Sequence, residues 1–327
     1  MEAAYYELRE DGKIHCVLCP SHCIISNGKS GACRVRTNHD GTLVADSYAE
    51  VAAMALDPIE KKPLYHFHPG SQILSVGPNG CNFHCGFCQN WGISQQTAET
   101  RHIEPEELAG MAPRNGSIGI AYTYTEPFIW FEYVRDTGKL VRERGMVNVL
   151  VTNGYVNEHP LRELLPLIDA MNVDVKSMKP EFYRNVCGGK LEDVLRTVEV
   201  SNGLCHIEIT NLVITNYNDT DEDFNLLTDW LASINPSIPL HFSRYFPAYR
   251  FTEPPTAGDR IKSACEIASR KLKYVYAGNI PLGGLSDTRC PVCKNTLISR
   301  SYYAVTIPGI KNGKCTSCGT PAEVVGI

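Results

Sequence analysis

Short apolar runs alternate with longer amphipathic stretches through the middle of the chain. The apolar runs predict strands, which lie at 73–77, 117–122, 147–152, 171–176, 206–214, 239–244 and 274–278. Between them, apolar residues that recur every three or four positions predict helices at 105–111, 127–144, 157–168, 190–201, 221–234 and 258–272. Because strands that alternate with helices pair in parallel through βα units, we predict an α/β fold.

Composition divides the chain into three regions. Residues 1–69 are rich in cysteine and read as irregular, so we expect an N-terminal metal-binding region. Residues 70–284 hold the alternating strands and helices and form the predicted core. Residues 285–327 are polar and bear four cysteines, with too few apolar side chains to fold without a metal.

The overall charge argues against two classes of partner. The net charge is −5 and the isoelectric point about 6.1, so no basic field would attract nucleic acid or an anionic membrane. No apolar run approaches the ~20 residues that a membrane span needs. The first residues lack the features of a secretory signal, so we expect a cytoplasmic protein.

Fourteen cysteines are many for such a chain, and eleven of them fall into three groups at the spacing of metal ligands. The groups are Cys16, Cys19, Cys23 and Cys33; Cys81, Cys85 and Cys88; and Cys290, Cys293, Cys315 and Cys318. A disulfide framework has no need of such clustering, so we predict metal sites. The other three, Cys187, Cys205 and Cys265, are expected to be small core residues or incidental thiols.

The central group follows directly on the first strand of the alternating region. Three thiolates at C-x3-C-x2-C can hold three irons of a [4Fe-4S] cluster and leave the fourth iron open to a small molecule. Such folds place cofactors at this end of a strand. Phe87, just before the third cysteine, could support an adenine ring. The alternative is a zinc knuckle completed by His84.

This pattern, with an aromatic residue before the last cysteine, resembles the signature of the radical S-adenosylmethionine (SAM) superfamily. The resemblance implies a partial (βα)6 barrel of the TIM type, with SAM across the carboxyl ends of the strands. It implies catalytic cysteines at Cys81, Cys85 and Cys88, and an oxidoreductase-like reaction in which reductive cleavage of SAM gives a 5′-deoxyadenosyl radical. That radical takes hydrogen from a substrate. The implied electron donor is a low-potential protein of the flavodoxin or ferredoxin type.

The resemblance also assigns residues to the binding of SAM. They are Phe87, Thr125, Glu126, Thr152, Asn153, Asp174, Lys176, Asn211, Val213 and Arg244. Glu126 stands where the family usually has Gly-Gly-Glu, although the glycines are absent here. Asp174 is assigned to a ribose hydroxyl and Lys176 to a carboxylate, in a segment that looks like that of activating enzymes for glycyl-radical proteins. The alternative for this pair is an internal salt bridge.

A closer match is to the radical SAM proteins of the AmmeMemoRadiSam system, a group near the pyruvate formate-lyase activating enzymes. It is carried by residues 16–23, 28–33, 57–67, 88–91 and 274–279. The match implies the other two proteins of that system as partners. The substrate is then a protein or peptide, or alternatively a small biosynthetic intermediate. A third hypothesis for the function is that the protein is a non-catalytic metal scaffold or electron carrier.

The two flanking cysteine groups differ in what they indicate. The C-terminal group forms two C-x2-C knuckles separated by 21 residues, which is typical of a zinc ribbon. Rubredoxin-like iron uses the same four thiolates. The N-terminal group, C-x2-C-x3-C-x9-C with His15 and His22 nearby, fits a second iron-sulfur cluster and structural zinc equally.

Overall fold

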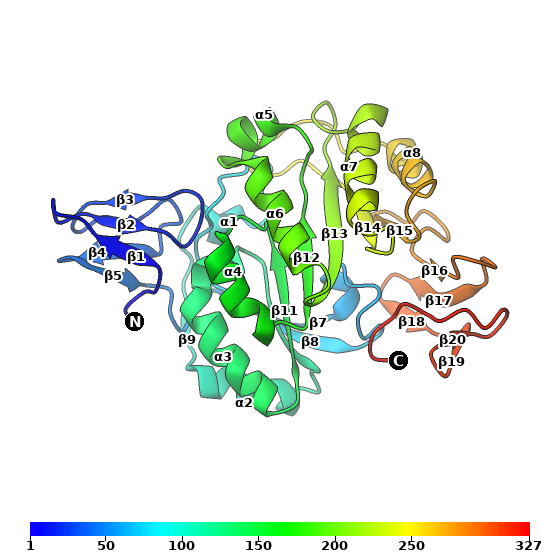
Figure 1. The fold of residues 1–327 in the computed structure, drawn as a ribbon, viewed down its shortest axis with the longest axis horizontal. Coiled ribbons are helices and arrows are strands. Elements are labelled where there is room, and N and C mark those ends of the chain that lie inside the picture. The colour runs from blue at the N-terminus through cyan, green and yellow to red at the C-terminus, as the bar shows by residue number, and fades with distance from the viewer.

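The computed structural model describes residues 1–327, and its centre is one eight-stranded sheet (Figure 1). Its strands follow the order β15 (Val275–Gly278), β14 (Leu240–Arg244), β13 (His206–Val213), β12 (Ala170–Asp174), β11 (Val147–Thr152), β10 (Gly119–Tyr122), β8 (Gln72–Gly77) and β7 (Ala53–Pro58). All neighbours are parallel except β7, which runs antiparallel to β8. The seven predicted strands and the parallel α/β class are therefore confirmed. The edge strand β7 was not predicted, because its apolar residues do not alternate with polar ones.

The helices connect successive parallel strands. They are α2 (Pro105–Arg114), α3 (Phe131–Glu143), α4 (Glu158–Leu164), α6 (Leu191–Ser201), α7 (Asp221–Ile234) and α8 (Gly258–Ala268), with 3-10 turns at Ile59–Lys61, Pro127–Trp130 and Leu165–Leu167. Each predicted helix is present. The short α1 (Trp91–Ser94) and α5 (Pro180–Phe182), followed by a π-turn at Tyr183–Cys187, were not predicted because they span too few residues to show a period. None of these helices combines the length and the apolar character that crossing a bilayer requires.

The predicted helix at 221–234 matches α7 at both ends, because a local signal fixes its start. The Thr220 hydroxyl accepts the backbone N–H of Asp223, and the Asp223 carboxylate accepts the backbone N–H of Thr220. This capping box satisfies two donors that the first turn would otherwise leave free. Helix boundaries without such a box differ from the prediction by a few residues.

The two faces of the sheet differ in chemistry. On β14, Phe242 packs against Phe224 of α7, with ring centroids 5.4 Å apart. The neighbouring His241 points to the opposite face and hydrogen-bonds Glu208 on β13 at 2.7 Å. The segment after β7 crosses this second face, where His66 donates its backbone N–H to Glu208 at 2.7 Å. The face away from the helices is therefore polar and is partly filled by the chain itself.

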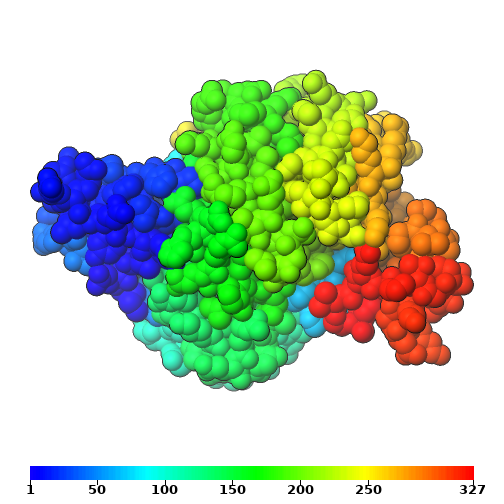
Figure 2. Space-filling model, viewed as in Figure 1, coloured from blue at the N-terminus to red at the C-terminus, as the bar shows by residue number.

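The N-terminal region is not irregular, so that expectation was wrong. It contains the antiparallel strands β1 (Tyr6–Leu8), β2 (Ile14–Cys16) and β3 (Ile24–Ile25), the hairpin β4 (Arg36–His39) and β5 (Thr42–Ala45), and β6 (Glu50–Val51), which pairs with β9 (Arg101–His102). These strands are too short for alternation to be visible in the sequence. Together they form a lobe at one end of the molecule (Figure 2).

The C-terminal residues lie at the other end of the long axis (Figure 2). They form β16 (Thr288–Arg289), β17 (Thr296–Ser301), β18 (Ala304–Thr306), β19 (Ile310–Lys311) and β20 (Lys314–Cys315). Arg300 on β17 donates to the backbone carbonyl of Tyr65 at 2.6 Å. The last residues run back to the sheet, where the Val325 carbonyl accepts the backbone N–H of His68 at 2.8 Å. The module is thus attached to the segment that crosses the polar face.

Candidate active site and metal centres

The three central cysteines lie on the loop that follows β8. Cys85 is buried, and Cys81 and Cys88 are partly exposed. The Cys81 sulfur accepts a backbone N–H within the loop at 3.4 Å, and the Cys88 sulfur hydrogen-bonds the Ser94 hydroxyl at 3.1 Å. Burial raises the pKa of Cys81 well above its usual value, and the neighbouring Glu126 and Cys85 add to that rise. Because the loop follows β8 directly, the three thiols lie at the carboxyl end of this strand, as the sequence predicts.

The three central sulfurs are not grouped as tightly as the C-terminal ones. Three or more cysteine, histidine or carboxylate ligands with all their atoms within 4.8 Å of one another are found at the four C-terminal cysteines and not at the central trio. Four thiolates around one zinc ion stand about 3.8 Å apart, given Zn–S bonds of about 2.3 Å. The cysteines of an iron-sulfur cubane bind different irons and stand further apart. His84 is exposed and hydrogen-bonds Gln95 at 3.0 Å, so its imidazole does not complete a zinc knuckle here.

Cys187 lies next to this loop and was not predicted to do so. It is fully buried at the end of the π-turn, and its carbonyl accepts the His84 backbone N–H at 2.7 Å. A hydrogen bond from the Cys187 thiol lowers the pKa of Cys85. Nothing in the sequence signals this contact, because an isolated cysteine a hundred positions away looks like a core residue.

Glu126 is a buried anchor between two strand ends. Its carboxylate accepts the backbone N–H of Phe128 at 2.9 Å, the Thr152 hydroxyl at 2.7 Å and the backbone N–H of Asn153 at 2.8 Å. Burial raises its pKa to about 7. Both oxygens are used within the chain, so the structure gives Glu126 a positioning role. A direct contact of Glu126 or Thr152 with SAM stays a prediction.

Asn153 and Thr125 are both tied to the cysteine loop. The Asn153 amide donates to the Asn82 side chain at 2.9 Å and approaches the Cys81 sulfur at 3.7 Å. The Thr125 hydroxyl donates to the Pro78 carbonyl at 3.0 Å. Asn82 was not singled out from the sequence, although its position inside the cysteine motif was a possible signal. The ends of β10 and β11 thus hold the loop that carries the central thiols.

Asp174 and Lys176 form the internal salt bridge that the sequence left as an alternative. Their charged atoms are 2.8 Å apart, and the Lys176 side chain is 11% exposed. The Lys176 ammonium lies 5.9 Å from the ring centre of Phe87. Phe87 in turn packs against Phe182 and Phe251, with centroids 6.0 and 5.6 Å apart. Phe87, Asp174 and Lys176 therefore share one side of the cysteine loop.

The last three residues assigned to SAM, Asn211, Val213 and Arg244, lie in two different places. Asn211 donates to the backbone carbonyl of Val175 at 2.8 Å and so supports the segment of the ion pair. Val213 is fully buried, and its carbonyl accepts the Thr256 hydroxyl at 2.5 Å. Arg244 donates to the Thr256 carbonyl at 2.8 Å. These hydrogen bonds of Val213 and Arg244 are thus made to Thr256, and none of them is made to the cysteine loop.

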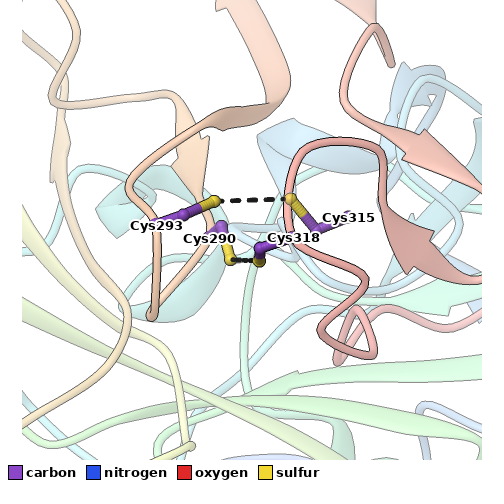
Figure 3. A group of neighbouring side chains, drawn as sticks. All are labelled: Cys290, Cys293, Cys315 and Cys318. Atoms are coloured by element: carbon purple, nitrogen blue, oxygen red, sulfur yellow. Dashed lines mark hydrogen bonds between the residues drawn. The ribbon is translucent and has the colours of Figure 1, made fainter.

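The four C-terminal cysteines converge on one point (Figure 3). The sulfurs of Cys290 and Cys318 are 3.6 Å apart, as are those of Cys293 and Cys315. This spacing is close to the ~3.8 Å expected around one tetrahedral ion. A hydrogen bond from Thr320 lowers the pKa of Cys318, which favours the thiolate that a metal needs. The group can hold one zinc or one iron ion.

The four N-terminal cysteines line one small cavity, together with Arg36. His15 and His22, considered as additional ligands, do not line it. A larger cavity of about 450 Å³ lies between the ends of β14 and β15, the segment after β7 and the C-terminal module. Its wall includes Glu60 and Arg300, each of which has one buried polar atom without a hydrogen-bond partner. Burial raises the pKa of Glu60.

The sequence of this chain is similar to those of several known proteins. The family model of the radical SAM superfamily matches residues 76–231. The chain is 41% identical over 333 residues to Uncharacterized protein MJ0808 of Methanocaldococcus jannaschii, covering 99% of both chains. It is 25% identical over 171 residues to the pyruvate formate-lyase 1-activating enzyme of Escherichia coli, covering 50% of this chain and 69% of that enzyme.

A similar fold is found in Streptococcus suis SuiB, crystallised with its precursor peptide SuiA. The TM-score is 0.51 at 14% identity, over 68% of this chain and 51% of SuiB. At this level of identity the similarity concerns the fold alone.

Proposed function

We propose that the chain, whose residues 76–231 match the family model of the radical SAM superfamily, is an enzyme that cleaves SAM reductively and abstracts hydrogen from a substrate. The observation that carries the proposal is the gathering of Cys81, Cys85 and Cys88 at the carboxyl end of β8 beside Asn153 and Lys176. A [4Fe-4S] cluster on these cysteines would leave one iron free for SAM and supply the electron that yields a 5′-deoxyadenosyl radical.

We assign the remaining roles from the positions of the side chains. Phe87 and Asp174 would receive the adenosyl part and Lys176 would meet a carboxylate, since the three side chains lie together beside Cys85. Thr125 and Asn153 would orient the cysteine loop, and Glu126 would fix Asn153. The parallel sheet would be the partial (βα)6 barrel, with its open side between β15 and β7.

We propose three domains, at residues 1–69, 70–284 and 285–327. The first would bind an iron-sulfur cluster or zinc at its four cysteines, and the last would hold one zinc or iron ion. A radical SAM enzyme requires a reductant. We propose that the electron donor is a low-potential protein of the flavodoxin or ferredoxin type.

The substrate we propose first is a protein or peptide, because the relatives include an activating enzyme. The other two proteins of the AmmeMemoRadiSam system are candidate partners. The second candidate is a small molecule, which the 450 Å³ cavity at the ends of β14 and β15 favours. Transfer of deuterium from labelled candidates into 5′-deoxyadenosine distinguishes the two.

The reaction is tested by incubating the anaerobically reconstituted, reduced protein with SAM. We expect 5′-deoxyadenosine and methionine, and a loss of at least about a hundredfold in Cys88→Ala, because a missing cluster ligand removes the reacting centre. Cys205→Ala is the matched control, since that cysteine lies outside the three groups. Formation of 5′-deoxyadenosine by Cys88→Ala at the normal rate would refute the proposal, and absence of SAM binding would favour the electron carrier.

A further inference from the structure

The Ser94 side chain lies beside one of the three central cysteines. Ser94 is the last residue of the short helix α1, which begins just after the cysteine loop, and it is 2% exposed. Its hydroxyl oxygen is 3.1 Å from the Cys88 sulfur. The other donors to the central sulfurs are nitrogens, which reach Cys81 at 3.4 and 3.7 Å. Ser94 therefore supplies the one side-chain hydroxyl that is hydrogen-bonded to a central cysteine.

The Gln95 side chain indicates the direction of this hydrogen bond. Its amide nitrogen donates to the Phe83 carbonyl at 3.0 Å, and because a carbonyl can only accept, the orientation of the amide is fixed. The same nitrogen donates to the Ser94 hydroxyl oxygen at 3.4 Å. The hydroxyl proton of Ser94 is then free to point at Cys88. A cysteine that binds iron is a thiolate without a proton, so Ser94 can only be the donor to it.

Arg34 of the N-terminal lobe holds the backbone around Ser94. Its guanidinium donates to the carbonyls of Ser94 and Gln95, at 2.7 Å each, and to that of Gln96 at 3.2 Å. Carbonyls at the end of a helix have no partner within the helix, so this cation satisfies groups that α1 leaves free. The hydroxyl is thus held against Cys88 by Gln95 through the side chain and by Arg34 through the backbone.

We infer that the Ser94 hydroxyl donates a hydrogen bond to the Cys88 ligand of the central cluster and makes that cluster easier to reduce. Reduction adds one electron from the reductant, and hydrogen bonds to the sulfurs help to set the potential at which this happens. A donor stabilises the more negative, reduced form more strongly, because hydrogen bonds to charged groups are the stronger ones. Ser94 keeps its proton and acts through Cys88, so it is a positioning residue. The inference rests on the proposed cluster at the central cysteines.

The test is a redox titration of the full-length, anaerobically reconstituted protein with dithionite, followed by EPR spectroscopy without SAM. In Ser94→Ala we expect the equilibrium constant for one-electron reduction to fall about three- to tenfold, where tenfold is a shift of ~59 mV to more negative potential. Ser94→Thr keeps a hydroxyl and should restore the potential. Ser201→Ala is the matched control, because Ser201 is also a buried serine at the end of a helix but its hydroxyl has no hydrogen-bond partner.

Iron and sulfide are measured in each variant, because a merely structural role would lower the cluster content without moving the potential. If Ser94→Ala does not bind iron, Ser94→Gly, which also lacks the hydroxyl, is titrated in its place. An unchanged potential in the variant without the hydroxyl, or an equal shift in Ser94→Thr, would overturn the inference. The proposed reaction would then still stand, since the unmodified protein would form 5′-deoxyadenosine. Failure of the unmodified protein to bind iron and sulfide at the central cysteines would overturn both.

Discussion

Gly80 is the residue at which two cysteine sites meet. Its φ is +92°, in the left-handed region that favours glycine, and it precedes Cys81. The carbonyl of Cys33 and the side chain of Val35 leave no space for a Cβ, at 2.5 and 2.9 Å. The central loop and the N-terminal lobe therefore touch through backbone, and any side chain here would separate them.

Gly80→Ala is expected to lower the free energy of unfolding by about 1–3 kcal/mol, because the backbone is strained and the neighbouring carbonyl must move. Anaerobic urea unfolding measures this change. Gly92→Ala is the matched control, since a Cβ there meets nothing within 4 Å. Equal stability of the two variants would show that the lobe is not held at Gly80.

At the scale of residues, the sequence was informative where chemistry is encoded by spacing. The cysteine groups could be found because their ligands recur within a few positions. Cys187 and Ser94 could not be found, because each acts through a contact that only the fold creates. The salt bridge of Asp174 and Lys176 was foreseen as an alternative, because a charged pair at a strand end has few other partners.

At the scale of elements, length decided what could be predicted. Strands such as Val147–Thr152 and helices such as Asp221–Ile234 show a clear period and were predicted with their bounds. The strands of the N-terminal lobe were missed because two to four residues carry no period. The segment after β7 was missed for another reason: its position across the sheet depends on polar contacts such as that of His66 with Glu208.

His66 makes that segment sensitive to acid. Its ring hydrogen-bonds Tyr276 at 2.6 Å and the Glu323 carbonyl at 2.7 Å, and burial lowers its pKa from 6.5 to about 4. The unfolded chain therefore binds a proton between these values that the folded chain does not. Stability from this group is complete above pH 6.5 and falls as the pH drops toward 4.

We expect the protonation of His66 alone to make the free energy of unfolding roughly 3 kcal/mol lower at pH 4 than at pH 7. Urea unfolding at both pH values measures it. His66→Gln removes the titration and keeps a polar side chain, so its loss of stability over the same range should be smaller. A loss as large as that of the unmodified protein would assign the acid sensitivity to other groups.

At the scale of the whole molecule, two cysteine-bearing ends flank one sheet (Figure 1). The C-terminal module has a buried core of four residues, two of which are the metal-type ligands Cys290 and Cys315. So small a core depends on the metal for its stability. Arg300 links the module to Tyr65 and forms part of the wall of the 450 Å³ cavity.

Removing this metal should loosen the module without affecting the central site. In Cys293→Ser/Cys318→Ser, which changes the two exposed thiols, we expect amide exchange in β17 to accelerate at least about tenfold, or ~1.4 kcal/mol. The iron bound by the central cysteines should be unchanged. Protection in β17 equal to that of a Cys205→Ser control would show that the module folds without its metal.

The nearness of the Cys187 thiol to Cys85 has a practical consequence for handling the protein in air. Two neighbouring thiols that approach each other can lose two electrons and two protons to an oxidant such as peroxide, which is reduced to water, and become covalently joined. Once Cys85 is joined in this way, it is lost as an iron ligand. Material purified aerobically would then resist reconstitution until a dithiol reagent had reopened the bond, whereas Cys187→Ala material would accept iron and sulfide directly.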